Sequence, residues 1–325
     1  MAPTPSNSSA WAGLRVVALA GGVGGARLAY GLATLLPPEQ FSIIVNTGDD
    51  FENLGLTICP DVDTVTYTLA GLSNLETGWG IAGDSFHTLA QLRQLGEDVW
   101  FHLGDRDLAT HLLRTRWLQD GGRLTDFTRA LCKQLGVGPA ILPMTDDPCR
   151  TMVLTELGEL DFQTYFVRHA WQPRILSLRW DGLERAKPSP EVLACLKTAH
   201  LVVLCPSNPF VSIDPILKLP GLYGLIAAKT CVAVSPIIAG QAVKGPAAKM
   251  FAELGIPASA FSIAQHYQDL LKGIVLDDAD AGLVERIQTL GMQAIVMPTL
   301  MKSLPERIEV ARGVLEFGAR LLGTN

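Results

Sequence analysis

The sequence predicts an α/β protein: a doubly wound, mostly parallel, Rossmann-like sheet that carries a large α+β insertion. Short runs of consecutive apolar residues predict strands buried on both faces, as parallel strands are. Helical patterns separate most of these runs, and this alternation is typical of βαβ units. Strands are predicted at residues 16–20, 42–46, 201–205, 230–235, 273–276 and 294–297.

Four glycines join the first predicted strand to the first predicted helix. They are Gly21, Gly22, Gly24 and Gly25, and Arg27 opens the helical pattern that follows. A helix N-terminus offers unpaired N–H groups and a positive dipole end, and glycine lets a phosphate approach the backbone closely. We therefore expect an anion at this corner, with the Arg27 guanidinium beside it. The pattern is neither G-x-G-x-x-G nor a P-loop, and a tight turn without a ligand is the alternative.

Residues 64–195 differ from the rest and predict an insertion that is part helical and part β. Helical periodicity covers 86–95, 108–118 and 127–135, and short antiparallel strands are expected at 150–156, 162–168 and 175–178. The Rossmann-like, nucleotide-binding core then comprises residues 14–63 and 196–325, after a disordered tail at 1–13. Within the core, residues 305–322 predict a long amphipathic helix against the sheet.

Composition narrows the class of protein. The chain has 325 residues, of which 48% are hydrophobic and 18% charged, enough for one large or two modest globular domains. No apolar run approaches the ~20 residues of a membrane span and no signal peptide is evident, so we expect a soluble cytoplasmic protein. The net charge of −6 argues against nucleic-acid binding. Six scattered cysteines without a C-x-x-C pair predict neither a zinc site nor disulfides.

Acidic residues follow the second predicted strand, where the carboxyl ends of parallel strands border a ligand crevice. Asp49 and Asp50 come just after Asn46, and Asp61 and Asp63 follow a little later. Four carboxylates beside a phosphate are favourable when a hard divalent cation such as magnesium (Mg2+) lies between them. Two alternatives remain open. Asp61 or Asp63 merely caps the next helix, or Asp49 or Asp50 binds a ribose hydroxyl as in dinucleotide-binding proteins.

A third polar loop precedes the helix predicted at 108–118. Arg106 has no structural role there, and its guanidinium suits a phosphate or a polar ring substituent. Asp107 is expected to cap the helix. His111 lies one turn further along and is left without a role, because histidines on helix faces mostly pack against the protein or face solvent.

Two more loops follow predicted strands of the core. Ser207 and Asn208 lie between prolines after the strand at 201–205, and their polar groups suit a purine edge or a phosphate, unless the segment is only a rigid turn. Lys244 follows the strand at 230–235 and reaches an anion there, unless it is simply solvated. Because four polar loops gather at strand ends, the sequence predicts a nucleotide cleft.

Taken together, several motifs resemble those of the 2-phospho-L-lactate transferase family (CofD/FbiA) of deazaflavin coenzyme F-420 biosynthesis. The resemblance runs from about residue 15 to the C-terminus. The motifs are, in order, GGVGGAR, NTGDD, CPDVDT, GWG at 78–80, LGDRDLATH, PSNP and SPIIAG. The resemblance implies a homodimer with a Rossmann-like core, and an enzyme that requires Mg2+. It implies transfer of a phospholactyl or phosphoenolpyruvyl group from its guanosine diphosphate adduct to the ribityl hydroxyl of the deazaflavin Fo, releasing GMP.

The resemblance also implies roles for individual residues. The glycine corner, Ser207 and Asn208 match the guanosine-nucleotide side of the family's site, and we add Asn46 and Lys244 as nucleotide contacts. Asp50 and Asp63 fall on acidic motifs that serve Mg2+ or the deazaflavin, and Arg106 on a basic position associated with deazaflavin binding. The insertion is then expected to cover the deazaflavin side of the cleft.

These assignments give a mechanistic hypothesis. The ribityl hydroxyl attacks the phosphoryl group distal to guanosine in line, while Asp50 and Asp63 hold the metal and one of them orients or deprotonates the hydroxyl. Asp50, Asp63 and Arg106 are thus the expected catalytic residues. The alternatives are an NAD(P)-dependent oxidoreductase with Asp50 on the ribose, and a non-catalytic nucleotide-binding protein of related fold.

Overall fold

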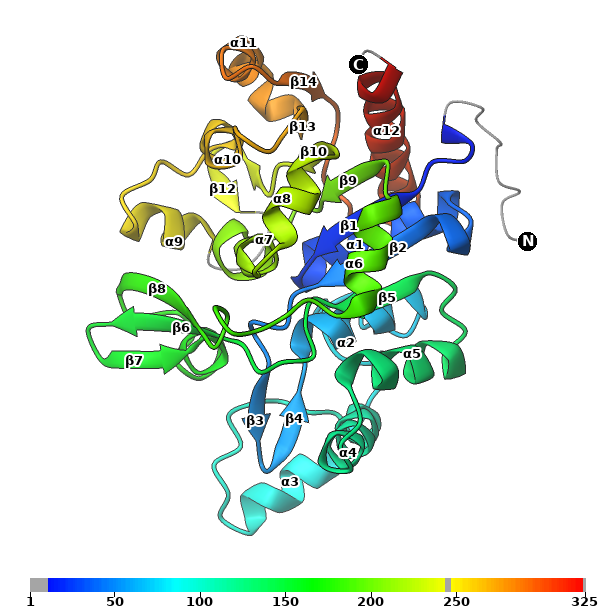
Figure 1. Ribbon diagram of the computed structural model, residues 1–325. Helices are drawn as coiled ribbons and strands as arrows, with labels where there is room; N and C mark the ends of the chain where they lie inside the picture. Colours follow the sequence, from blue (N-terminus) through cyan, green and yellow to red (C-terminus); the bar gives the residue numbers. More distant parts are fainter. Residues whose placement is uncertain (1–10, 243–246, 324–325) are drawn as a thin grey trace.

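A seven-stranded parallel sheet forms the centre of the protein (Figure 1). The computed structural model describes residues 11–242 and 247–323. The strand order is β14-β13-β10-β9-β1-β2-β5, and every neighbouring pair is parallel. The strands are β1 (Val16–Ala20), β2 (Phe41–Val45), β5 (Ala140–Pro143), β9 (Leu201–Leu204), β10 (Thr230–Val234), β13 (Gly273–Leu276) and β14 (Gln293–Val296). The predicted α/β class and parallel sheet are confirmed.

The direction of the strand order reverses at β1. From β1 the chain runs outward through β2 to β5, and it then returns to the other side of β1 to form β9, β10, β13 and β14. Ligand sites of open α/β sheets lie at such a reversal, beyond the carboxyl ends of the strands. The topology alone therefore places a crevice between the ends of β1 and β9.

Helices cover both faces of the sheet, and β1 shows how the sequence directs this. Val16, Ala18 and Ala20 point to one face, and Val17 and Leu19 to the other, as the two-residue period of a strand requires. The first face packs against α1 (Gly22–Leu35), α2 (Pro60–Leu69) and α12 (Leu304–Gly323). The α12 helix matches the predicted C-terminal helix.

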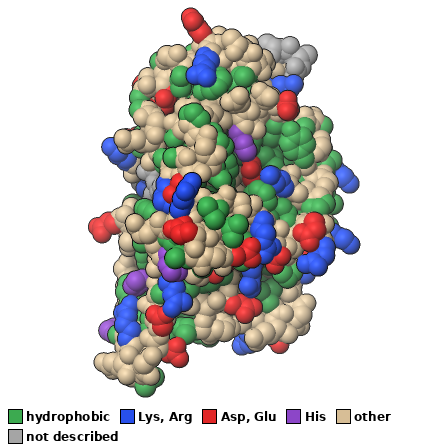
Figure 2. Space-filling view, turned by 90° about the vertical axis from the view of Figure 1, so that its left-hand side faces the viewer, with side chains coloured by type: hydrophobic (Ala, Val, Ile, Leu, Met, Phe, Trp, Pro, Cys, Tyr) green, Lys and Arg blue, Asp and Glu red, His purple; other side chains and the backbone are tan. Residues whose placement is uncertain are grey.

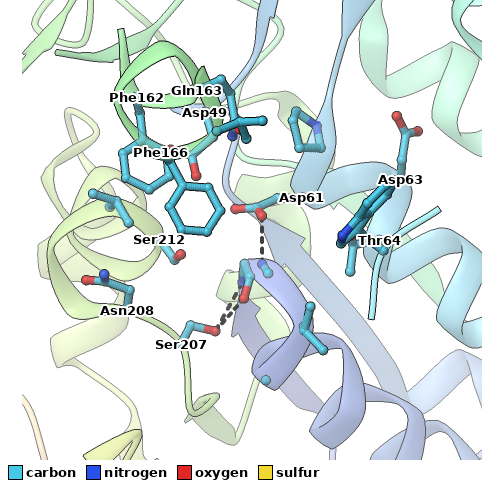
Figure 3. A pocket seen from close by; sticks show the side chains of 18 of the residues that line it. Asp49, Asp61, Asp63, Thr64, Phe162, Gln163, Phe166, Ser207, Asn208 and Ser212 are labelled. Carbon is cyan, nitrogen blue, oxygen red and sulfur yellow. Dashed lines mark hydrogen bonds between the residues drawn. The ribbon is translucent and has the colours of Figure 1, made fainter. Parts of the chain in front are cut away.

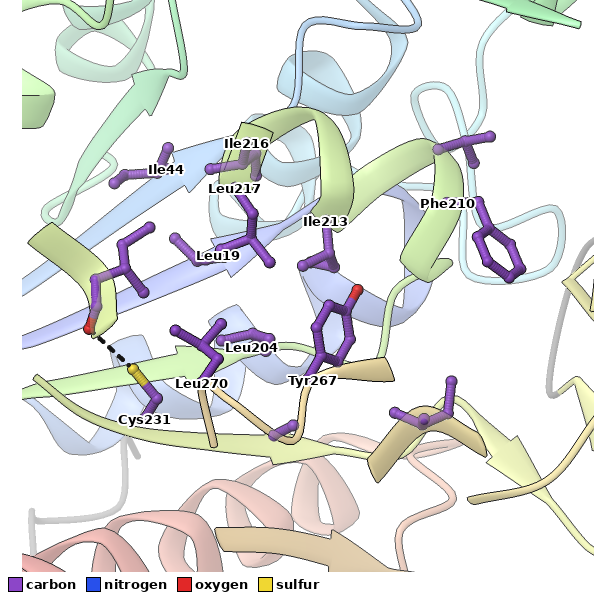
Figure 4. Packing of buried hydrophobic residues seen from close by; sticks show 14 of the residues in the cluster. Leu19, Ile44, Leu204, Phe210, Ile213, Ile216, Leu217, Cys231, Tyr267 and Leu270 are labelled. Carbon is purple, nitrogen blue, oxygen red and sulfur yellow. Dashed lines mark hydrogen bonds between the residues drawn. The ribbon is translucent and has the colours of Figure 1, made fainter. Parts of the chain in front are cut away.

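The second face of the sheet carries the larger apolar core (Figure 4). There Leu19, Ile44 and Leu204 of the strands meet Ile216 and Leu217 from the helical side. The helices on this side are α6 (Pro190–Thr198), α7 (Asp214–Lys218), α8 (Leu222–Ala227), α10 (Ala260–His266) and α11 (Val284–Gln288). Burial of each large apolar side chain contributes roughly 1.5–3 kcal/mol to folding.

Two groups of elements extend beyond the sheet (Figure 1). Between β2 and β5 lie the hairpin of β3 (Phe51–Asn53) and β4 (Leu56–Ile58), then α2, which packs on the sheet, and after it α3 (His87–Gln94), α4 (Asp105–Gln119) and α5 (Leu124–Gln134). After β5, an antiparallel sheet forms from β6 (Arg150–Thr155), β7 (Gly158–Asp161) and β8 (Ile175–Asp181). The smaller elements β11 (Ile237–Ile238), β12 (Gln241–Ala242) and α9 (Ala247–Glu253) follow β10.

Some local predictions differ from the structure. The strand predicted at 162–168 is wrong, because Thr164–Arg168 forms a π-helical turn. Phe162 and Phe166 are four residues apart and their rings stack, which is a helical rather than an alternating pattern. The domain division stays a prediction. β5 lies inside the range 64–195 but belongs to the central sheet, and Trp11, within the predicted tail, is buried in the core. Residues 1–10 of that tail lie outside the described residues.

Within the described ranges, no helix has the length and apolar character needed to cross a bilayer. On the face seen in Figure 2, basic and acidic side chains are intermingled rather than gathered by sign. All six cysteines are free.

Candidate functional site

A pocket of about 400 Å³ opens where the strand order reverses. Its size lies in the range of small-molecule sites. One wall is polar and comes from the glycine corner, the start of α2 and the loop after β9 (Figure 3). The opposite wall is aromatic and comes from the segments outside the central sheet. The pocket therefore joins chain segments far apart in sequence.

The glycine corner forms the first turn of α1. The helix begins at Gly22, whose φ of +60° lies in the region that favours glycine. The Gly22 N–H donates to Asp61 Oδ1 at 2.7 Å, so one predicted phosphate donor is already bonded. Val23 and Gly24 also line the pocket, and the first N–H groups of a helix have no partner within it. These two amides are the N–H groups of the corner that stay predicted anion donors.

The loop after β9 holds the glycine corner in place. Ser207 Oγ accepts the Gly21 N–H at 3.2 Å and donates to the Gly21 carbonyl at 2.8 Å (Figure 3). A Cβ on Gly24 would lie 2.2 Å from the Pro206 carbonyl oxygen. The glycines thus permit close packing of the two loops. Asn208 lines the pocket, and its Oδ1 accepts the Phe210 N–H, which starts the π-helical turn Pro209–Ile213.

Two buried aspartates, Asp49 and Asp61, lie in the polar wall. Asp61 accepts the Gly22 N–H and, at Oδ2, the Asn46 amide at 2.9 Å. Burial nevertheless raises the pKa of Asp61 to about 6. Burial also raises the pKa of Asp49 well above its usual range, and the nearby charges of Asp61 and Asp50 raise it further. Asp49 Oδ1 has no hydrogen-bond partner among the described residues.

This pair fits a hard divalent cation. Two carboxylates that repel one another in a buried site are both stabilised by a positive charge between them. The described residues contain no cluster of three or more His, Cys, Asp or Glu side chains able to hold a metal. Mg2+ usually takes only one or two protein carboxylates, together with phosphate oxygens and waters. The donor set therefore suits a cation that arrives with a phosphorylated ligand.

Asp50 and Asp63, the acids expected to hold metal, are placed differently. Asp50 does not line the pocket, and its side chain bonds with Cys59 behind the wall. Asp63 lines the pocket, but both of its oxygens contact the buried guanidinium of Arg114, with Nη1 to Oδ2 at 3.0 Å. Figure 3 shows Asp61 directed toward the glycine corner and Asp63 away from it. Their metal role stays a prediction, and the geometry favours Asp49 and Asp61.

Arg106 also lies apart from the pocket. It is exposed, and its guanidinium donates to the Ala82 carbonyl at 3.2 Å. Two other residues of α4, Asp107 and His111, face the pocket instead. Tyr67 donates to Asp107 Oδ1 at 2.7 Å, and His111 Nε2 lies 3.3 Å from the same oxygen. The role of Arg106 stays a prediction.

The remaining predicted residues fall into three groups. Gly21, Gly22, Gly24, Arg27, Ser207 and Asn208 line the pocket. Gly25 and Asn46 stand behind the wall, Asn46 acting on it through Asp61. Lys244 lies outside the described residues.

The aromatic wall was missed by sequence reasoning. Trp79, Phe101, Phe162 and Phe166 line it, and the rings of Phe162 and Phe166 stack at 5.4 Å with an interplanar angle of 7°. Its signal was the aromatic pair at positions i and i+4, which was interpreted as part of a strand. A flat apolar wall opposite a polar corner suits a ligand with a planar ring at one end and a charged group at the other.

Comparison with known proteins gives a consistent picture. The family model described as 2-phospho-L-lactate transferase CofD matches residues 16–299. A protein named phosphoenolpyruvate transferase from Thermobifida fusca is 42% identical over 314 residues, covering 92% of this chain and 96% of that protein. One of the same name from Streptomyces griseus is 40% identical, covering 94% and 98%. A protein named 2-phospho-L-lactate transferase from Methanococcoides burtonii is 36% identical, covering 94% of this chain and all of its own length.

A solved structure shares the fold. A UPF0052 family member from Bacillus halodurans aligns with a TM-score of 0.62 at 18% identity, over 93% of this chain and 98% of that one.

Proposed function

Because this chain belongs to the 2-phospho-L-lactate transferase CofD family, and is a transferase enzyme, we propose that it moves a phosphoenolpyruvyl or 2-phospholactyl group from a guanosine diphosphate adduct to the ribityl hydroxyl of the deazaflavin Fo. GMP is the second product, and the reaction belongs to coenzyme F-420 biosynthesis. One observation carries the proposal. A single pocket pairs a glycine corner and two buried aspartates with a stacked aromatic wall.

The polar wall is the proposed donor side. The amides of Val23 and Gly24 bind phosphate oxygens, and the Arg27 guanidinium adds charge one turn along α1. Asp49 and Asp61 hold a divalent cation. When bound, Mg2+ supplies the positive charge that neutralises the diphosphate oxygens. The aromatic wall is the proposed acceptor side, where Phe162 and Phe166 contact the flat ring of the deazaflavin.

The proposed reaction is an in-line displacement at phosphorus. The ribityl oxygen forms a new P–O bond to the phosphoryl group that carries the three-carbon acid, and the P–O bond to GMP breaks. Asp49 accepts the hydroxyl proton in this proposal, because its Oδ1 has no hydrogen-bond partner among the described residues. The protein otherwise contributes positioning, which is the larger part of catalysis in phosphoryl transfer.

Mass spectrometry of the products tests this function. The protein is incubated with Fo, Mg2+ and either the lactyl or the enolpyruvyl adduct of guanosine diphosphate, and we expect GMP and phosphorylated Fo with at least one of them. Asp49→Asn should lose at least ~10²-fold in rate. Asp120→Asn, at an exposed position after α4, is the matched control and should keep full rate. Absence of product from both adducts, or oxidation of NADH by the same preparation, would reject the proposal.

A further inference from the structure

A second cationic group adjoins the glycine corner. Arg27 of α1 and Arg307 near the start of α12 both line a small side pocket next to the main one. The side pocket shares Val23 and Arg27 with the main pocket, and Ser73 and Asn74 from the segment after α2 also line it. Its volume of about 10 Å³ admits a group the size of one oxygen atom.

Neither arginine has an acidic partner in the part of the chain that the structure describes. Arg307 is only 3% exposed, and its Nε has no hydrogen-bond partner there. Its guanidinium lies over the ring of Tyr30 at 5.6 Å. Burial lowers the pKa of Arg307, and the charge of Arg27 lowers it further, so the two cations lie close enough to repel each other.

A buried cation without a counterion is costly, and a second cation beside it adds to the cost. Packing alone does not require this arrangement, because methionine would fill the same space against Tyr30 without charge. An anion between the two guanidinium groups would remove the repulsion and complete their hydrogen bonds. The side pocket adjoins the main one at Val23 and Arg27, so such an anion can belong to a ligand seated there.

We propose that Arg27 and Arg307 form a subsite for an oxyanion, a phosphate or carboxylate group that inserts an oxygen atom between the two guanidinium groups. This proposal extends the proposed function. The subsite itself does not depend on that function, but the identity of its natural occupant does. On that basis, the occupant is a charged group of the donor. Arg307 then serves as a binding residue contributed by the C-terminal helix, nearly 300 residues from the glycine corner in sequence.

Thermal unfolding with inorganic phosphate as the probe tests the subsite. Phosphate is added at constant ionic strength to the wild-type protein, to Arg307→Met and to Arg320→Met, an exposed arginine of the same helix. At ten times its Kd, phosphate should raise the Tm of the wild type and of Arg320→Met by about 2–4 °C. Arg307→Met should have a higher Tm without phosphate and at least a tenfold weaker affinity for it.

An equal response to phosphate in wild type and Arg307→Met would overturn the subsite, as would a lower Tm of that variant together with unchanged affinity. If Arg307→Met does not fold, the same phosphate titration is made with Arg27→Met, at the half-buried partner, and is judged by the same criterion. A further arm repeats the titration in saturating GDP. Loss of the phosphate response assigns the subsite to the nucleotide's own phosphate, and its persistence assigns it to a separate oxyanion. The assay contains neither Fo nor donor, so failure of the transfer reaction would leave this result intact.

Discussion

Asp49 and Asp61 suit the binding of a cation, but burying their charged forms lowers the stability of the folded protein. Both carboxyl groups are buried in the pocket wall, and burial raises the pKa of each. A carboxyl with a raised pKa in the folded state holds its proton more tightly there than in the unfolded chain. The contribution of each carboxyl to the free energy of unfolding is therefore largest below the unfolded pKa near 4. It falls as the pH rises through the folded pKa, which is about 6 for Asp61.

We expect Asp49→Asn to remove part of this pH dependence. At pH 8, without metal, the variant should be more stable than the wild type by on the order of 1–3 kcal/mol, because an amide needs no counterion. At pH 4 the two proteins should differ little. Urea unfolding at both pH values measures the difference. Adding MgCl₂ together with GDP at pH 8 should stabilise the wild type more than the variant, and identical pH profiles would contradict the prediction.

Single residues also show where the sequence stopped being informative. The strand-to-helix turn at the glycine corner and six of the seven strands of the central sheet are local patterns, and they were predicted correctly. Which aspartate faces the pocket depends on a partner far along the chain, since Asp63 is held by Arg114 from another helix. The aromatic wall depends on how Phe162 and Phe166 fold over the pocket, and no local pattern gives that.

Among the elements, α2 and α4 are joined by a buried ion pair. Arg114 of α4 is fully buried and contacts both oxygens of Asp63 in the first turn of α2. When two opposite charges are buried as a pair, each compensates for the other's loss of hydration, whereas burying either one alone is strongly unfavourable. The pair therefore fixes a helix beyond the sheet to a helix on the sheet, beside the pocket that both line.

Breaking this pair from one side should be more harmful than removing it entirely. Arg114→Met should lower the free energy of unfolding by about 3–5 kcal/mol, because Asp63 stays buried without a counterion. The double variant Asp63→Asn/Arg114→Met should recover most of that loss. Unfolding in urea of the wild type, the two single variants and the double variant forms a complete cycle. Additive losses would mean that the two side chains act independently.

Across the whole molecule, the pocket is the place where the sheet meets the outlying segments. Its polar wall comes from the ends of β1 and β9 and from α2, and its aromatic wall from residues 77–80, 101–102 and 162–167. A ligand with a charged end and a flat end would contact both walls at once. The proposed donor and acceptor would then contact segments that lie far apart in the sequence.

Hydrogen exchange should separate the two walls. We expect GDP with Mg2+ to slow amide exchange at 21–25 and 206–212, and Fo alone to slow it at 162–167, because each ligand orders the wall that it contacts. Exchange in β13, which does not line the pocket, is the internal control. Slower exchange of the glycine corner on addition of Fo alone would reverse the assignment of the two walls.

The position of β1 in the middle of the sheet also bears on how the protein is made. β1 pairs on one side with β2, which is synthesised soon after it, and on the other side with β9, where Val16 meets Leu201. About 150 residues separate the end of β2 from β9, and a ribosome adding roughly 5–20 residues per second needs about 8–30 s to supply them. Throughout that interval the nascent chain exposes an apolar strand edge. Its yield in a cell should therefore depend on chaperones that shield such edges.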